Sequence, residues 1–136
     1  MKKRKLNLDF EYGWKKTDFV YPKSFLGHKH PAIYTWVLIA KNGEKSYYLG
    51  ETSNLTQRVS RYMRPGRSQA TNIRIKAEMD NSKEVLLYTI DINTLVLNGQ
   101  KLDKSELEDK YTRRGLEGLL IRELKMRKSG HIIHNR

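Results

Sequence analysis

Arg58 and Tyr62 stand four residues apart in a segment whose apolar residues recur at helical spacing, so both side chains are expected on one face of a helix. A guanidinium group suits a phosphate because it is planar, always charged and able to donate two parallel hydrogen bonds. Arg61, Arg64 and Arg67 add positive charge nearby and are candidates for contacting nucleic acid. The alternative is a basic surface helix in which Arg58 has no special role.

Glu117 is the carboxylate whose position most needs an explanation. On a helical wheel, Leu120, Ile121 and Leu124 fall within about 60° of Glu117, so the carboxylate lies inside an apolar stripe. An unpaired carboxylate there is costly and needs a metal ion, an arginine or a hydrogen-bond donor as its partner. Arg113 is one helical turn earlier, and an ordinary ion pair between the two stays open.

Gly115 and Gly118 flank this carboxylate within the same predicted helix. Glycine inside a helix costs about 1 kcal/mol relative to alanine, so two of them call for a reason. Either another backbone or a ligand approaches closely at this point, or the helix packs tightly against a neighbour.

Tyr34 and Tyr48 lie on two segments that are predicted to form a hairpin. A two-residue loop would pair Tyr48 with Val37 and place the two tyrosines on opposite faces of the sheet. A three-residue loop, with Gly43 in the left-handed conformation, pairs Tyr48 with Trp36 and places both tyrosines on one face. We expect the second arrangement.

The elements that must position these side chains follow from hydrophobic periodicity and turn residues. An apolar strand and a returning strand closed by Gly50 precede a helix capped by Ser53 or Asn54. A second helix and a third strand follow, and Asp103 with Glu106 forms a capping box for a long last helix. The expected ranges are 32–40, 45–49, 55 to the break at Pro65, 69–79, 85–92, and from the capping box to about Lys128, ending near Gly130.

This order, β-β-α-α-β-α, indicates an α/β (α+β) fold with a small three-stranded, largely antiparallel central sheet flanked by helices. Residues 1–30 mix aromatic residues with lysines and show no sustained period, so we expect an N-terminal extension packed on or flanking a domain of residues 31–136. The basic residues 2–5 are a nucleic-acid contact, a localisation tag or a solvated terminus.

Composition narrows the classes of function. The 136 residues include 27 Lys and Arg against 15 Asp and Glu, a net charge of +12, which favours a polyanionic partner and is also found in proteins that are simply basic. The absence of cysteine excludes disulfides, cysteine-held zinc and thiol nucleophiles. No apolar run is long enough for a membrane span and no signal segment is apparent, so we expect a cytoplasmic location and no membrane partner.

Taken together, these residues resemble the GIY-YIG nuclease family over residues 31–136. Ala32-Ile33-Tyr34 is similar to the first signature of the family, with alanine in place of its glycine. Tyr48-Leu49-Gly50 is similar to the second, with leucine in place of isoleucine. Residues 50–62 resemble the stretch that follows the second signature in the nuclease subunit of bacterial excision repair.

The resemblance implies a metal-dependent endonuclease that hydrolyses DNA phosphodiester bonds. Glu117 fits the metal-binding glutamate of the family and would hold one Mg²⁺ or Mn²⁺, which would stabilise the leaving 3′ oxygen and the charge on phosphorus. Tyr48 would be the general base that activates water, with Tyr34 beside it. Because tyrosine ordinarily titrates near 10, this role requires a nearby cation.

The resemblance also assigns supporting roles. Arg58 would supply positive charge to the base and to the transition state. Tyr62 would hydrogen-bond the phosphate or the attacking water, and Asn135, which fits the late asparagine of the family, would position phosphate or orient its neighbours. The implied partner is DNA; because no recognition module is apparent, a homodimer or a separate targeting protein stays open.

Two positions depart from the family pattern: Ala32 replaces a glycine, and Glu51 stands where the repair nuclease has a lysine-bearing pattern. A negative group close to Tyr48 would raise its pKa, the wrong direction for a base. Two other functions therefore stay open: a nucleic-acid-binding module of the same fold with little or no cleavage, and a basic structural protein bound to RNA.

Overall fold

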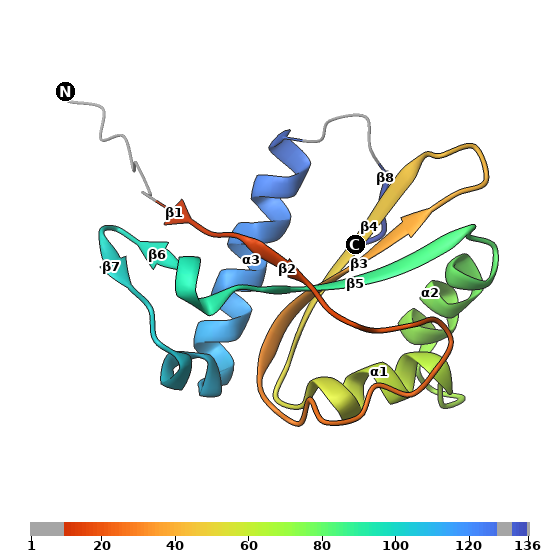
Figure 1. Ribbon diagram of the computed structural model, residues 1–136, viewed down its shortest axis with the longest axis horizontal. Coiled ribbons are helices and arrows are strands. Elements are labelled where there is room, and N and C mark those ends of the chain that lie inside the picture. Colours follow the sequence, from red (N-terminus) through yellow and green to blue (C-terminus); the bar gives the residue numbers. More distant parts are fainter. Residues whose placement is uncertain (1–9, 128–131, 136) are drawn as a thin grey trace.

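The computed structural model describes residues 10–127 and 132–135 (Figure 1). The basic residues 2–5 and Gly130, near which the last helix is expected to end, lie outside this part of the chain. The strands are β1 (Phe10–Glu11), β2 (Trp14–Lys16), β3 (Ala32–Ile39), β4 (Lys45–Thr52), β5 (Glu84–Ile90), β6 (Val96–Leu97), β7 (Gln100–Lys101) and β8 (Ile132–Ile133). The helices are α1 (Leu55–Met63), α2 (Ala70–Asp80) and α3 (Lys110–Arg127), with short 3-10 helices η1 (Ile92–Thr94) and η2 (Lys104–Glu108).

The fold is α+β, as predicted, but the predicted three-stranded sheet is too small. The central sheet has the strand order β2-β5-β3-β4-β8, in which β8 is parallel to β4 and the other neighbours are antiparallel. A second sheet has the order β1-β6-β7. The predicted element order lacks all five strands that are only two or three residues long, because so short a strand shows no period in the sequence.

The hairpin of β3 and β4 has the register expected for a three-residue loop. Trp36 lies opposite Tyr48, and the Ala40 amide donates to the Glu44 carbonyl at 2.9 Å. Gly43 has φ +85°, the left-handed conformation that this loop needs. Tyr34 and Tyr48 therefore lie on the same face of the sheet, and this prediction is confirmed.

Gly50 does not end β4, contrary to expectation; the strand continues to Thr52. Gly50 is the partner of Tyr34 in the β3–β4 ladder, and a Cβ at position 50 would overlap the hydroxyl and ring of Tyr34. Glycine is thus required here so that an aromatic ring can lie across the neighbouring strand, and not because the chain turns.

Capping residues predicted the starts of two helices, and one of these two predictions is confirmed. Asn54 caps α1, its side chain accepting from the Gln57 amide at 3.1 Å. The capping box of Asp103 and Glu106 is present, but it begins η2 and not the long helix. The prediction of one continuous last helix is wrong, because the backbone becomes extended at Asp109 before α3 begins.

Helices cover both faces of the central sheet, with α1 and α2 on one face and α3 on the other (Figure 1). The first face buries a cluster that includes Tyr34, Trp36, Leu55, Tyr62, Ile75 and Met79. The second buries a cluster that includes Ile33, Val37, Leu49, Leu107, Leu116 and Leu120. Within the described residues, no helix has both the length and the apolar composition needed to cross a membrane.

The described part of the N-terminal segment is built into these layers. Residues 14–16 form β2 at one edge of the central sheet, where Trp14 pairs with Ile90. Phe19 packs on Trp36, and Phe25 packs on Phe19, both buried in the cluster beneath α1 and α2. Burying two aromatic rings contributes several kcal/mol, so this segment is expected to stabilise the sheet that positions the site.

Candidate active site

One pocket gathers side chains from β3, β4, all three α-helices and the segment after β8. It holds about 410 Å³. Among the residues that line it are five of the predicted site residues: Tyr34, Tyr48, Arg58, Glu117 and Asn135. Tyr62, Arg61, Arg64 and Arg67 do not line it; the three arginines are exposed on or just after α1, and Tyr62 is buried.

Tyr34 and Tyr62 form a buried pair behind the pocket. Their hydroxyls lie 2.8 Å apart, and each side chain is 1% exposed. Burial raises the pKa of both phenols well above the ordinary value, so both are protonated at neutral pH. Tyr62 therefore does not line the pocket itself. Its ring contacts the rings of Tyr34 and Tyr48, which do line it.

Tyr48 is half-buried and its phenol faces several charges. Burial is the largest cause that raises its pKa, and the charge of Glu117 acts in the same direction. Interaction with the Tyr62 hydroxyl and the charges of Arg74 and Arg58 lower the pKa without cancelling that rise. In the protein alone, Tyr48 is thus less often in the phenolate form than an ordinary tyrosine.

Glu117 is a half-buried carboxylate on the pocket side of α3. Burial and the charge of Glu51 raise its pKa, whereas Arg58 and Arg114 lower it. Among the described residues, no arginine, lysine or histidine nitrogen comes within ion-pair distance of it. The carboxylate is therefore partly desolvated and lacks a close counterion, the condition in which a carboxylate readily accepts a cation.

Arg113 does not pair with Glu117, although the two are one turn apart on α3. Its Nε donates to Glu51 at 2.7 Å, and its Nη1 donates to the carbonyls of Leu107 and Glu108 at 2.9 and 3.0 Å. The Arg113–Glu117 ion pair that the sequence left open is therefore not formed. Arg113 instead fastens α3 to β4 and to η2.

The Glu51–Arg113 pair was not found from the sequence, because its members are 62 residues apart in the chain. One signal was available: an arginine on the apolar face of a helix, like the carboxylate beside it, needs a buried partner. The pair also bears on the expected effect of the Glu51 charge on the pKa of Tyr48. The Glu51 charge is balanced by Arg113 and, at 3.9 Å, by Arg114.

The end of the described chain closes one wall of the pocket. The Asn135 side-chain amide accepts from the Leu49 amide at 2.9 Å and donates to the Leu49 carbonyl at 2.8 Å, as a neighbouring strand would. Arg74, another lining residue that the sequence did not indicate, donates to the His134 carbonyl at 2.9 Å. Asn135 thus holds the segment after β8 against the backbone of β4 at the pocket.

Gly115 and Gly118, which flank Glu117, have open space around them. A Cβ built at Gly115 or Gly118 meets no atom within 4 Å beyond the helix itself. Of the alternatives left open, tight packing and a nearby backbone are therefore not found among the described residues, and the close approach of a ligand is not tested. Both positions are exposed beside the pocket.

The donor set of the pocket fits a single hard cation. Within the described ranges, no group of three or more His, Asp and Glu side chains converges. Glu51 and Glu117 are the two carboxylates that line the pocket, and Glu51 is already held by Arg113. One carboxylate suits Mg²⁺ or Mn²⁺, which keeps several waters and takes phosphate oxygens from a substrate, better than zinc.

Comparisons of the chain with protein-family models, with curated proteins and with solved structures gave no match. The likeness to the GIY-YIG family therefore stays a resemblance in residue types and their order. What the site does has to be argued from its own geometry and charges.

Proposed function

We propose that this protein is a metal-dependent endonuclease that hydrolyses phosphodiester bonds in DNA. The observation that carries the proposal is the convergence of three chemistries on one pocket: phenols from β3 and β4, a guanidinium from α1 and a carboxylate from α3. The alternative partner of the carboxylate, Arg113, is engaged elsewhere. The net charge of +12 supports a polyanionic substrate.

In this proposal each lining residue has a distinct task. Arg58 binds the scissile phosphate and stabilises the charge that builds on it. Glu117 would hold one Mg²⁺ or Mn²⁺, which when bound supplies positive charge at the phosphate and the leaving oxygen. Tyr48, once its phenol has lost its proton to solvent, accepts a proton from the attacking water as phenolate, and the buried Tyr34–Tyr62 pair fixes the position of its ring.

The proposed mechanism accounts for the partly buried charges that surround Tyr48. Arg58 and Arg74 both lower the pKa of Tyr48, and a cation held at Glu117 would lower it further because it offsets the charge of that carboxylate. A bound cation would therefore favour the phenolate, the form of Tyr48 that can accept a proton. Residues with opposed effects on each other's pKa are typical of sites that transfer protons.

The proposal is tested by plasmid cleavage with Mg²⁺ or Mn²⁺. Wild type should cut, and Glu117→Gln should reduce the rate by about a hundredfold or more, as loss of a main electrostatic contributor does. Glu123→Gln is the matched control, because Glu123 lies on the same helix and pairs with Arg127 at the surface. Equal cleavage by the two variants, or none by wild type with either metal, would overturn the proposal.

One observation favours a second candidate, a DNA-binding module with feeble cleavage. The pKa of Tyr48 is raised in the protein alone, which disfavours the base form. This candidate predicts that wild type and Tyr48→Phe bind duplex DNA equally and cut equally slowly under single-turnover conditions. The nuclease proposal predicts equal binding and much slower cutting by Tyr48→Phe.

A further inference from the structure

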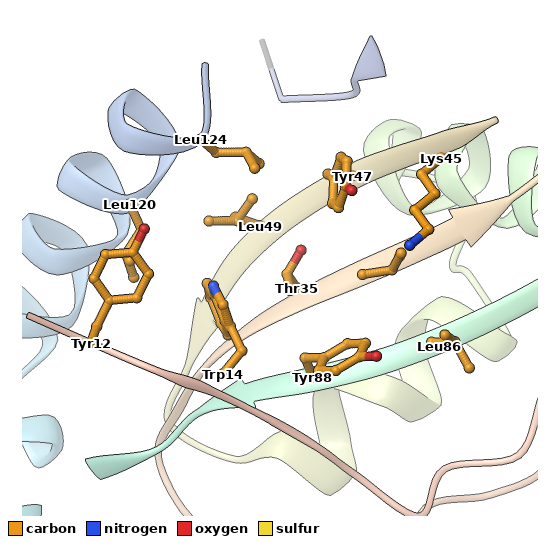
Figure 2. A pocket seen from close by; sticks show the side chains of 11 residues that line it. Tyr12, Trp14, Thr35, Lys45, Tyr47, Leu49, Leu86, Tyr88, Leu120 and Leu124 are labelled. Carbon is orange, nitrogen blue, oxygen red and sulfur yellow. The ribbon is translucent and has the colours of Figure 1, made fainter. Parts of the chain in front are cut away.

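A second pocket is lined by Leu120 and Leu124 of α3 and lies over the face of the central sheet that α1 and α2 do not cover (Figure 2). It holds about 230 Å³ and is walled by aromatic and aliphatic side chains, among them Tyr12, Trp14, Tyr47, Tyr88 and Leu120, with Lys45 at one end. Leu49 lines both pockets, but none of the residues named here lines the proposed cleavage site.

The sheet register places aromatic and basic groups on one surface here. Lys16 is directly opposite Tyr88 in the β2–β5 ladder, so the two side chains share a face of the sheet. Trp14, two residues before Lys16, shares that face as well. Both Lys16 and Lys45 are exposed, and the rings of Trp14 and Tyr88 are only partly buried.

Figure 2 shows how these groups surround the pocket. Trp14 and Tyr88 lie along one side, Leu120 and Leu124 project from α3 on another, and the ammonium group of Lys45 is turned inward. Helix α3 packs on β4 and β3, and among residues 10–127 and 132–135 this leaves the part of the face over β5 and β2 open to a ligand.

Partly exposed rings next to lysines form a surface of defined chemistry. Nucleobases stack on aromatic side chains whatever their sequence, and nearby cations bind the phosphates between them. A base within a duplex is already stacked and cannot offer its face. We propose that this pocket binds unpaired bases of single-stranded DNA, with Trp14 and Tyr88 as stacking surfaces and Lys16 and Lys45 as phosphate contacts.

Charge argues for this occupant over a second copy of the chain. Two copies that meet at this face would bring together two molecules of net charge +12, including Lys16 and Lys45 from each. A single strand of DNA instead neutralises these lysines and releases its own counterions. An apolar peptide would leave the two ammonium groups without any such gain.

The inference does not require that the protein cleaves DNA. Binding at this pocket is therefore measured on the Glu117→Gln variant in EDTA, where the proposed cleavage is disabled. If wild type fails to cut and single-strand binding is nonetheless found, only the nuclease proposal fails. If wild type cuts and single-strand binding is absent, only the present inference fails.

Tryptophan fluorescence gives a direct reading of this pocket. The chain has two tryptophans, and Trp36 is 0% exposed within the core, so a ligand that stacks at the surface alters the emission of Trp14. We expect a short oligo-dT strand to quench the emission, and a duplex of the same length at the same ionic strength to quench it far less. Trp14→Phe should abolish the change.

Two substitutions then assign the contacts. Tyr88→Ala should weaken binding of labelled oligo-dT, measured by anisotropy, by about fivefold or more, since stacking on one ring is worth at least that. Lys45→Ala, which changes an exposed residue and spares the fold, should weaken binding and lower its salt dependence. Tyr111→Ala and Lys110→Ala, at the distant start of α3, are the matched controls and should have no effect.

Four results would overturn the inference. They are the absence of quenching by oligo-dT, equal quenching by the duplex, unchanged affinity in both Tyr88→Ala and Lys45→Ala, and a fluorescence change that depends on protein concentration without DNA. The last result would assign this face to contact between copies of the chain.

Discussion

Glu117 and Leu120 are three residues apart on α3, yet they face two pockets of opposite character. On the side of Glu117, the lining includes Arg58, Arg74 and the phenol of Tyr48. On the side of Leu120, the lining is mostly aromatic and aliphatic (Figure 2). Neighbouring residues of one helix thus line a pocket of partly desolvated charges and a pocket of apolar rings.

The two pockets differ in what they contribute to the stability of the fold. Burial of Leu116 and Leu120 against the sheet is favourable and needs no exact geometry. The charged side is unfavourable by itself, since burial raises the pKa of Glu117 and so disfavours its ionised form. Groups held in such surroundings by a well-packed scaffold are typical of functional sites.

The largest effect is expected at the ion pair that fastens the charged side. Arg113→Ala removes three hydrogen bonds and leaves Glu51 partly buried without its main counterion. The free energy of unfolding should fall by about 3–5 kcal/mol in urea titrations followed by circular dichroism. Arg114→Ala, whose side chain is 57% exposed, should cost at most about 1 kcal/mol. Equal losses would mean that the pair is no stronger than a surface contact.

The second prediction concerns the ring of Tyr34, which lies over Gly50 of β4. Gly50→Ala forces a methyl group into the space of Tyr34 and should destabilise the protein by about 1–3 kcal/mol. In a Tyr34→Leu background the same substitution should cost clearly less, because the ring is gone. Thermal and urea unfolding of the four proteins in this cycle measure the coupling. Costs that simply add would show that the two side chains do not compete for one space.

The third prediction concerns protonation on the charged side. Because the pKa of Tyr48 lies above its ordinary value near 10, the phenolate fraction is small at neutral pH and rises about tenfold with each pH unit below that pKa. If Tyr48 is the base, the single-turnover cleavage rate should rise in the same proportion between about pH 7 and 9. Tyr48→Phe should lose this dependence. A flat profile in wild type would remove Tyr48 from the mechanism.

The smallest effect is expected at an open position beside the site. Gly118→Ala places a methyl group where no described atom lies within 4 Å, and alanine favours the helix. The free energy of unfolding should rise by up to about 1 kcal/mol. A decrease, measured in the same urea titrations, would mean that this side of α3 is more closely packed than the described residues show. Gly27→Ala is a contrasting control, since its φ of +82° is strained for any side chain.

Local signals in the sequence predicted much of the scaffold correctly. Asn54 caps α1, the loop at Gly43 sets the register of Tyr34 and Tyr48, and the apolar spacing of α3 places Glu117 beside a pocket. Each of these features depends on residues close together in the chain. Capping, turn geometry and side-chain period act over a few residues, and a sequence therefore reveals them directly.

The features that the sequence did not predict depend on contacts between distant segments. The Glu51–Arg113 pair, the capture of the Leu49 backbone by Asn135 and the pairing of β2 with β5 all join residues far apart in the chain. Strands as short as β2 carry no period of their own. Gly50 was read as a strand end because its actual cause, the ring of Tyr34, comes from another strand.

The ring of Tyr34 lying over Gly50 has a consequence for how this protein can change over time. Neither position is free to vary alone, since a larger residue at 50 needs a smaller one at 34 and a vacated ring space invites a side chain to fill it. We therefore expect substitutions at the two positions to be tolerated mainly in combination. Mutant libraries aimed at this hairpin should randomise both codons together.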